Sequence, residues 1–304
     1  MGQDREIYIG PWVGEFGHWI MYVVPFINGI CHLNPDATII TSAFRGDDIY
    51  LRDKSGNKIA DIFIPLEWWP CNRGNADIHD ILPEYPQKVL DSFRKHENHI
   101  DICNIPFPQY QKMVKEATTR LYYRFGLWYP NEVKDHVVVM PRGKNYQMDY
   151  YRSWPLERWE QLIYKLAERY KVYVGGIPQE SLANLKHENV VDYTTIENRP
   201  EETMKILNTA RACIADCCGG SQASVQVGCP TLVHGPDNIK IIYNTDNPNN
   251  KNWFQTNVEY IDWTDSRQLS VDKRLADAID FIEGKSNEFR SKRDTLFILP
   301  NACG

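Results

Sequence analysis

The sequence predicts an α/β protein built on parallel, Rossmann-like sheets. Over the second half of the 304-residue chain, strand-like runs alternate with helix-like runs, which is typical of parallel strands joined by helices. The chain opens in the same way, because the apolar run Ile7–Ile9 is followed by a glycine-containing loop and the long apolar segment Trp19–Leu33. Loops of this kind lie at the carboxyl ends of strands, where α/β proteins place their binding sites.

Five strands and three helices are predicted in the second half. Each strand is a short apolar run: His136–Met140, Lys171–Val174, Val190–Val191, Ala212–Ala215 and Thr231–His234. The first helix opens at Ser153-Trp-Pro155 and repeats apolar residues at i, i+3, i+4 and i+7 from Trp159. The second opens at Asn198, where a capping residue precedes proline and two acids. The third, a short one, follows Asp216–Gln222.

The first half is less regular. Beyond the opening strand and helix, strands are predicted at 38–41 and 62–66, helical material at 87–124, a linker at 125–135 and a helical tail at 271–293. The expected organisation is an N-terminal Rossmann-like domain over 1–130, a C-terminal one over 131–270 and a helical tail over 271–304. A chain of this length, with 42% hydrophobic residues, has enough apolar surface for two cores.

Composition excludes several classes of protein. The formal net charge of −6 argues against a surface that binds nucleic acid over its whole extent. The eight cysteines form no C-x-x-C pair and no regular framework, which favours a reduced, cytoplasmic setting over a disulfide scaffold or a zinc site. The longest apolar stretch is too short to cross a bilayer, and no basic, apolar leader opens the chain, so we expect no transmembrane segment and no secretion.

The segment Asp216-Cys-Cys-Gly-Gly-Ser-Gln222 is suited to phosphate. Gly219 and Gly220 stand between a strand and a helix, so backbone N–H groups can approach an anion without interference from a Cβ atom. Ser221 can cap that helix or donate to a phosphate oxygen. A tight strand-to-helix turn without a ligand explains this segment equally well.

A second candidate segment is Pro141-Arg-Gly-Lys-Asn145, which also follows a strand. Arg142 and Lys144 are cations at the carboxyl edge of the sheet, where a diphosphate needs neutralising. Their position favours function over ordinary surface charge. Arg152 is a weaker candidate of the same kind.

The first loop carries a candidate acid–base pair. Glu15 is preceded by Gly14, and His18 lies about one helical turn further on. A carboxylate in a glycine-rich loop can act as a general base that activates a hydroxyl group. The alternatives are that Glu15 caps its helix and that His18 is a polar residue of the first turn.

Other motifs are missing from the sequence. No two aspartates stand two apart, so the Asp-x-Asp metal clamp of many nucleotide-sugar enzymes is not present, and we expect no bound metal. The sequence also has no P-loop, no clear G-x-G-x-x-G fingerprint, no serine elbow and no zinc spacing. Kinase, dehydrogenase and hydrolase functions are therefore not supported.

Together these segments resemble a GT-B glycosyltransferase, and in particular the heptosyltransferase-like, family 9-like group. Gly14-Glu15 takes the place of the Gly-Asp that such enzymes carry after their first strand. Further segments are similar to the family's motifs: Arg142-Gly-Lys144, Trp154-Pro155, Val174-Gly-Gly176, Asp216–Gln222, Gly228-Cys-Pro230 and Gly235-Pro236. The resemblance covers 137–236 well and 7–33 moderately. It departs from the family at Gln222, near the place of a histidine, and at Glu15, which replaces aspartate.

The resemblance implies two Rossmann-like domains that face each other across a cleft, and a nucleotide-diphosphate sugar as donor. The donor phosphates would meet the 219–222 helix start together with Arg142 or Lys144, and the nucleoside would lie near Gly176 and Ile177. Glu15 would take the proton from an acceptor hydroxyl, which would attack the anomeric carbon with inversion and without a metal. The 271–293 tail would cross back onto the first domain.

Several alternatives stay open at this stage. The acceptor can be a glycan, a lipid-linked saccharide, a protein or, as for some viral relatives of this broad fold, a hydroxymethylated DNA base. A nucleotide-sugar epimerase of the GT-B type is a different enzyme class on the same architecture, and it needs more converging acids and histidines than the sequence shows. A non-catalytic nucleotide-sugar-binding module is the third alternative.

Overall fold

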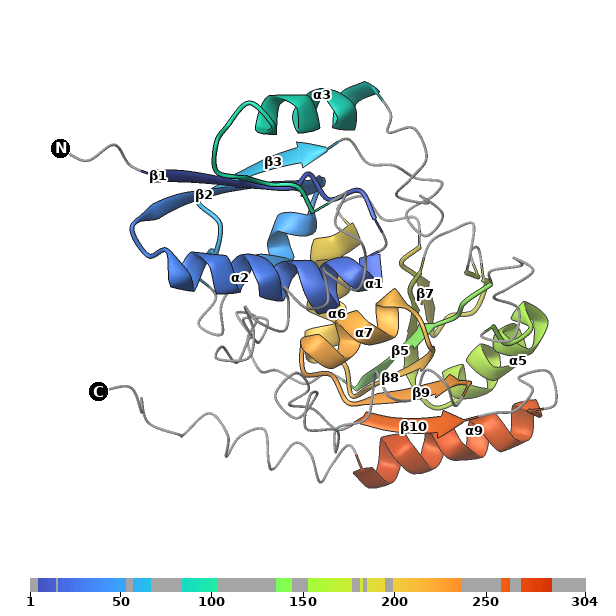
Figure 1. Ribbon diagram of the computed structural model, residues 1–304. Coiled ribbons are helices and arrows are strands. Elements are labelled where there is room, and N and C mark those ends of the chain that lie inside the picture. The colour runs from blue at the N-terminus through green and yellow to red at the C-terminus, as the bar shows by residue number, and fades with distance from the viewer. Residues whose placement is uncertain are drawn as a thin grey trace, which may run out of the picture. The chain divides into compact units, whose positions relative to one another are not determined.

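The computed structural model describes residues 5–14, 16–52, 57–66, 84–102, 135–143, 153–176, 181–182, 185–194, 199–236, 258–262 and 269–285. The chain divides into two compact units, Met1–Trp128 and Tyr129–Gly304. Each unit contains one parallel β-sheet with helices packed on it (Figure 1). Of the expected linker at 125–135, residues 125–134 lie outside the described residues.

The first unit is built on a four-stranded parallel sheet in the order β3-β2-β1-β4. Its strands are β1 (Arg5–Ile9), β2 (Ala37–Phe44), β3 (Ile62–Leu66) and β4 (His99–Ile100). Its helical segments are α1 (Phe16–His18), the π-helical η1 (Trp19–Val23), α2 (Val24–Leu33), the 3-10 turn η2 (Asp47–Tyr50) and α3 (Glu84–Phe93). The predicted strands at 7–9, 38–41 and 62–66 are confirmed.

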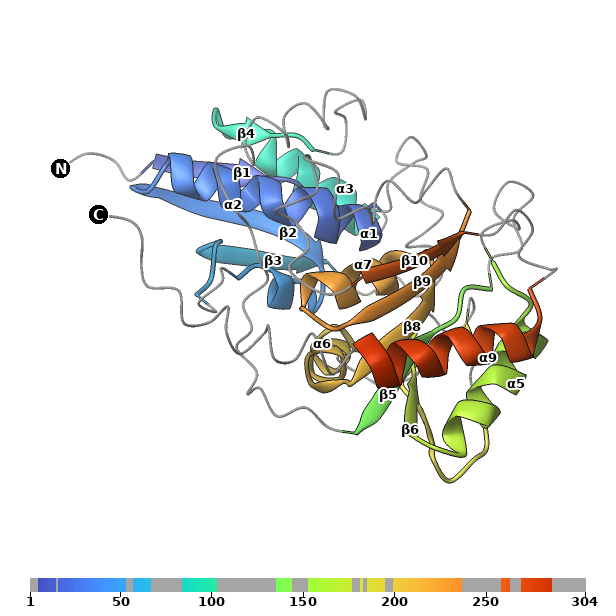
Figure 2. The ribbon, with the colours of Figure 1, turned by 90° about the horizontal axis from the view of Figure 1, so that it is seen from below.

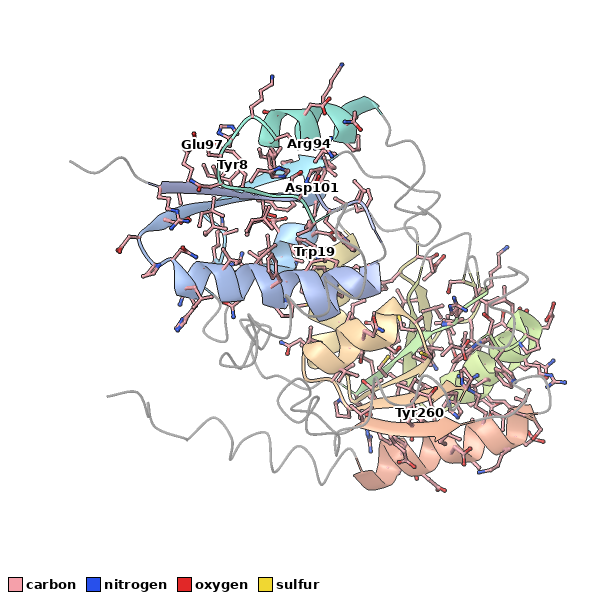
Figure 3. All side chains as sticks on the ribbon, in the orientation of Figure 1. Tyr8, Trp19, Arg94, Glu97, Asp101 and Tyr260 are labelled. Atoms are coloured by element: carbon pink, nitrogen blue, oxygen red, sulfur yellow. The ribbon has the colours of Figure 1, made fainter. Side chains whose placement is uncertain are left out.

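Opposite faces of this sheet pack against α2 and α3 (Figure 1). Side chains alternate along a strand, so Tyr8 and Ile40 point to the face covered by α3, where Val89 and Phe93 complete a core cluster. Trp19 is fully buried on the α2 side (Figure 3). The first sheet is therefore covered on both faces, as parallel sheets require.

The prediction of helical material over 87–124 is confirmed as far as Phe93 and is wrong at 99–100, while residues 103–124 lie outside the described part. Helix α3 ends at Phe93, and the chain turns into β4 at His99. The turn is closed by an ion pair in which Arg94 Nη2 lies 2.9 Å from Asp101 Oδ2 (Figure 3). Pairing with β1 decides this geometry, because the amide of Tyr8 donates to the carbonyl of Asn98.

The second unit contains a six-stranded parallel sheet in the order β10-β9-β8-β5-β6-β7. The strands are β5 (His136–Met140), β6 (Lys171–Val174), β7 (Val190–Asp192), β8 (Ala212–Asp216), β9 (Thr231–Gly235) and β10 (Val258–Asp262). Counted in chain order, this is the 3-2-1-4-5-6 arrangement of a Rossmann fold. All five predicted strands are confirmed, and β10 is an additional one.

In the described part of the second unit, four helices cover the sheet. They are α5 (Leu156–Ala167), α6 (Arg199–Thr209), α7 (Gly219–Gln226) and α9 (Val271–Asp280), the last continued by the π-helical η6 (Phe281–Lys285). Helices α5 and α9 lie side by side (Figure 2) and share one core cluster with the sheet. That cluster contains Trp159 and Leu162 of α5, Ala278 of α9 and Phe281 of η6.

The predicted helical tail is helical over residues 271–285. Because α9 presents a buried apolar face, residues 271–285 complete the core of the second unit. Residues 286–304 lie outside the described part, so a crossing onto the first unit stays a prediction. None of the helices in the described ranges is long and apolar enough to span a membrane.

Candidate functional site

The strand order of the second sheet defines its topological switch point. Strand β5 pairs with β6 on one side and with β8 on the other. The chain leaves β5 toward β6 and leaves β8 toward β9, so the connections from the neighbouring strands β5 and β8 run in opposite directions. In open α/β sheets, ligands bind beyond the carboxyl ends of the strands at such a point. The segments that follow β5 and β8 are 141–143 and 217–221, the two that the sequence singled out.

The turn after β8 forms a capped helix start. Cys218 is the N-cap of α7, with extended backbone at φ −150° and ψ 175°. The hydroxyl of Ser221 accepts a hydrogen bond from the Cys218 amide at 3.0 Å and donates one to the Cys218 carbonyl at 2.7 Å. Of the two roles that the sequence allows for Ser221, the structure therefore shows capping. Gly219 and Gly220 occupy the first two helical positions.

Close packing explains the glycines of this region. A Cβ atom on Gly220 would lie 3.1 Å from the sulfur of Met140, and one on Gly175 would lie 2.5 Å from it. Gly176 has φ +116°, a left-handed conformation that favours glycine, and its Cβ would lie 2.8 Å from Cβ of Ser181. The Met140 side chain thus supports the turns after both β6 and β8.

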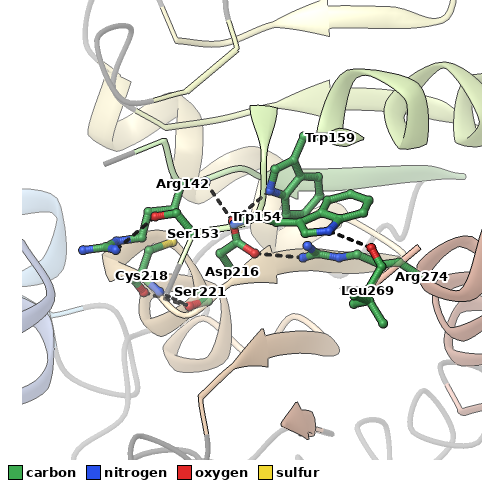
Figure 4. A network of polar contacts seen from close by, with 9 residues as sticks. All are labelled: Arg142, Ser153, Trp154, Trp159, Asp216, Cys218, Ser221, Leu269 and Arg274. Carbon is green, nitrogen blue, oxygen red and sulfur yellow. Dashed lines mark hydrogen bonds and ion pairs between the residues drawn. The ribbon is translucent and has the colours of Figure 1, made fainter. Parts of the chain in front are cut away.

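Arg142 is anchored at the carboxyl end of β5 and is 7% exposed. Its backbone amide donates to Asp216 Oδ2 at 3.2 Å, and its Nη1 donates to Ser153 Oγ at 3.2 Å. Figure 4 shows the guanidinium of Arg142 on the same side of Asp216 as Cys218 and Ser221. A predicted cation and the predicted phosphate turn therefore lie together in the folded unit.

Asp216, the last residue of β8, is a buried carboxylate that holds the segments around the site together. It is fully buried, and its oxygens accept hydrogen bonds from Arg142, Trp154, Trp159 and Arg274. Burial raises the pKa of the Asp216 carboxyl, while the Arg274 charge, the Trp159 indole and the Arg142 amide act in the opposite direction by stabilising the carboxylate. The Asp216 carboxylate therefore binds the Arg142 loop, α5 with the residues before it, and α9.

Gln222 is the fourth residue of α7. Its amide donates to the Cys218 carbonyl at 3.2 Å. Its side-chain oxygen is buried and, among the described residues, has no hydrogen-bond partner. A buried acceptor of this kind commonly pairs with water or with a ligand.

In the first unit, the loop at the carboxyl end of a strand that the sequence singled out is the one after β1. Gly10 has φ +112° and precedes Pro11 through a cis peptide bond, and its carbonyl lies 2.8 Å from His99 Nε2. A Cβ atom on Gly14 would meet the ring of Trp12 at 2.6 Å, so the loop packs tightly on itself. His18 is the last residue of α1, and its backbone alone is described.

Four of the predicted site residues lie outside the described part of the chain: Glu15, Lys144, Arg152 and Ile177. In contrast, Arg274 and Met140 belong to the observed site and were not predicted. A signal for Arg274 exists in the sequence, because it stands in the apolar stripe of α9 with Ala278 four residues further on.

Within the described ranges, no three His, Cys, Asp or Glu side chains form a group that could hold a metal ion. Among the described residues, the cysteines at 31, 213, 217, 218 and 229 form no disulfide with one another. Burial raises the pKa of the Cys218 thiol, although the amides of Ser221 and Gly220 donate toward its sulfur and favour the thiolate.

Comparison with known proteins gives a clear result for the fold. Neither a family model nor a curated protein matches the sequence. Among solved structures, E. coli ADP-heptose LPS heptosyltransferase II has a TM-score of 0.57 at 10% identity, with 92% of this chain and 99% of that one covered. A family 9 glycosyltransferase from Veillonella parvula has a TM-score of 0.56 at 10% identity, covering 93% and 98%.

A third similar structure is E. coli heptosyltransferase WaaC with ADP-2-deoxy-2-fluoro heptose. Its TM-score is 0.54 at 12% identity, and the alignment covers 91% of this chain and 99% of that one. At such identities the likeness concerns the fold. This chain has the GT-B fold of the heptosyltransferases and the family 9 glycosyltransferases, as the sequence motifs predict.

Proposed function

We propose that this protein is a glycosyltransferase that moves a sugar from a nucleotide-diphosphate sugar to a hydroxyl acceptor. One observation carries the proposal. At the switch point of the second sheet, the start of α7 lies next to the loop that bears Arg142, and the two are joined through Asp216. The GT-B fold supports the same conclusion, and WaaC, which shares that fold, is known with a nucleotide-sugar analogue.

The donor diphosphate meets the amides at the start of α7. The backbone N–H of Gly219, the N–H of Gly220 (which without a ligand donates toward the Cys218 sulfur) and the helix dipole favour an anion there, and Arg142 adds a full positive charge. Gln222 offers a side-chain amide on the same turn. Lys144 and Arg152 supply further charge, while Gly176 and Ile177 line the nucleoside side.

The transfer step uses a base from the first unit. Glu15 takes the proton from the acceptor hydroxyl, whose oxygen then forms a bond to the anomeric carbon of the sugar. The bond from that carbon to the donor phosphate oxygen breaks on the opposite face, so the configuration inverts. His18 assists Glu15 in this role.

The leaving nucleoside diphosphate gains negative charge as this bond breaks. Helix α7 and the cations stabilise that charge in place of a divalent metal, since the sequence has no Asp-x-Asp clamp. A saccharide hydroxyl is the acceptor that the heptosyltransferase-like motifs favour. A hydroxymethylated base is the alternative.

A thermal-shift screen with ADP, UDP, GDP and CDP, each alone and as its sugar conjugates, tests the donor site. A nucleotide present at 100 times its Kd stabilises the folded protein by about 2.7 kcal/mol, so the base that shifts Tm identifies the donor. If none of these ligands shifts Tm, the proposed function is wrong.

Two matched arginine variants localise the binding. Arg142→Gln removes the cation at the carboxyl edge of the sheet, and we expect it to weaken nucleotide binding about tenfold or more. Arg211→Gln removes one at the amino end of β8, where Arg211 pairs with Asp135 at 3.0 Å. Equal affinities in both variants would show that the phosphates bind elsewhere.

A further inference from the structure

Arg274 of α9 and Asp216 of β8 form an ion pair inside the second unit. Both side chains are fully buried, and Arg274 Nη2 donates to Asp216 Oδ1 at 3.1 Å. The guanidinium carbon lies 3.8 Å from the ring centroid of Trp159 and 4.6 Å from that of Trp154 (Figure 4). Two aromatic faces and a carboxylate thus hold the guanidinium in one orientation.

The second oxygen of the same carboxylate binds the segments around the proposed donor site. Oδ2 of Asp216 accepts the indole N–H of Trp159 at 2.8 Å, the amide of Arg142 at 3.2 Å and the amide of Trp154 at 3.4 Å. These donors come from the loop after β5 and from the start of α5. Asp216 itself immediately precedes the turn of residues 217–221, so one carboxylate joins the loop after β5, the start of α5 and the turn after β8.

The start of α9 is also fastened to this point. The indole N–H of Trp154 and Nη1 of Arg158 both donate to the carbonyl of Leu269, each at 3.0 Å. Arg274 lies about one turn into the helix that begins just after Leu269. Helix α9 is therefore linked to the turn of residues 217–221 through a short series of direct contacts.

Stability alone is a poor explanation for this arrangement. Removing two charges from water costs free energy, and apolar residues of similar size often serve a core as well or better. What a buried carboxylate with several directional donors provides is a defined geometry. Anion binding by backbone amides depends on such geometry, because the N–H groups must point at one place.

We propose that Asp216 and Arg274 are positioning residues for the donor-phosphate site. Arg274 orients the Asp216 carboxylate, and this carboxylate holds the Arg142 loop against the turn formed by residues 217–221. Neither side chain contacts the donor. The inference rests on the proposed function for the identity of the ligand, but the order of the two loops can be measured without any ligand.

The test compares a buried pair with an exposed pair between elements of the same unit. The variants Asp216→Asn, Arg274→Met and the double variant remove the buried charges. The control, Lys165→Met/Asp272→Asn, removes an exposed ion pair between α5 and α9, whose N···O distance is 3.2 Å. Three quantities are measured: Tm, the Kd for ADP, UDP, GDP or CDP, and amide hydrogen exchange.

Expected results separate positioning from stability. The double variant keeps a cooperative unfolding transition, since no uncompensated charge remains, but binds the nucleotide at least tenfold more weakly. The amides of Arg142, Trp154 and the 217–220 turn exchange faster, while those of β5 and β8 keep their protection. The exposed-pair control leaves the nucleotide Kd and the amide exchange rates at the wild-type values.

Other outcomes overturn one claim or the other. A folded double variant with wild-type Kd and wild-type exchange at these amides refutes the positioning role. If the wild-type protein binds none of the nucleotides, the proposed function fails, and the exchange data alone decide whether the buried pair orders the two loops. Should the double variant not fold, Arg274→Lys keeps the charge and loses the planar guanidinium, and the same loosening is expected.

Discussion

The sulfur of Met140, at the end of β5, lies 3.1 Å from the point where a Cβ atom on Gly220 would be. A side chain at Gly220 would press on the Met140 thioether, whereas Gly176 favours glycine because its φ is +116°. The thioether of Met140 fills the space below the first turn of α7. Met140 therefore packs against the residues whose backbone amides are proposed to bind phosphate.

Substitution of Gly220 tests this packing. Gly220→Ala forces the Met140 side chain to move, and we expect a loss of about 1–3 kcal/mol in the free energy of unfolding, measured by urea denaturation. The control is Gly284→Ala in η6, where a Cβ atom would have nothing within 4 Å. That variant should be neutral or slightly more stable. A Gly220→Ala protein as stable as the wild type would show that Met140 yields without cost.

Glu15→Gln tests the proposed base. The amide keeps the size of the side chain but cannot accept the acceptor's proton, so we expect unchanged nucleotide Kd and a loss of turnover of about 100-fold or more. The control is Glu6→Gln, an exposed acid of β1 that accepts a hydrogen bond from Tyr8. Turnover and Kd are measured on the same preparations. Wild-type turnover in Glu15→Gln would remove Glu15 from the mechanism.

His234 makes stability depend on pH. It is fully buried in β9, and burial, followed by the charges of Arg274 and Lys273, holds its pKa well below the ordinary value. In the unfolded chain the imidazole takes up a proton near pH 6.5, so the unfolded state binds more protons below that pH. The contribution of His234 to stability is therefore present above about pH 6.5 and is lost as the pH falls, by at most about 1.4 kcal/mol per pH unit.

The measurement is the free energy of unfolding in urea at pH 7 and pH 5. His234→Asn should show a smaller difference between the two pH values than the wild-type protein does. His32→Asn, which changes an exposed histidine of α2, should keep the wild-type difference. An identical pH dependence in all three proteins would mean that His234 takes up its proton without unfolding.

Removal of divalent metals tests the proposed charge stabilisation. If α7 and the cations neutralise the leaving diphosphate, EDTA should leave the transfer rate within about twofold of its starting value, because no Lewis acid is needed. The assay follows nucleotide release, with and without added Mg²⁺ or Mn²⁺. Loss of activity with EDTA that either ion restores would contradict the metal-independent mechanism.

Local pattern was sufficient for most strands of the sheets. His136–Met140 and Ala212–Asp216 are buried on both faces, so each is a continuous apolar run that can be recognised without any partner. Strand β4 was not predicted, because two residues carry no periodicity. Strand β10 was not predicted either, and its pairing with β9 is set by tertiary contacts.

The sequence by itself determined the parallel α/β class, the glycine turn after β8 and the cation after β5, because each depends on residues close together in the chain. Only the tertiary structure decided that β5 and β8 are neighbours, and that Arg274 reaches Asp216 from 58 positions away. The physical reason is that a buried charge needs an oppositely charged or hydrogen-bonding partner, and local sequence propensity does not determine which distant residue provides it. Those partners are brought together when the sheet and its helices pack into one core.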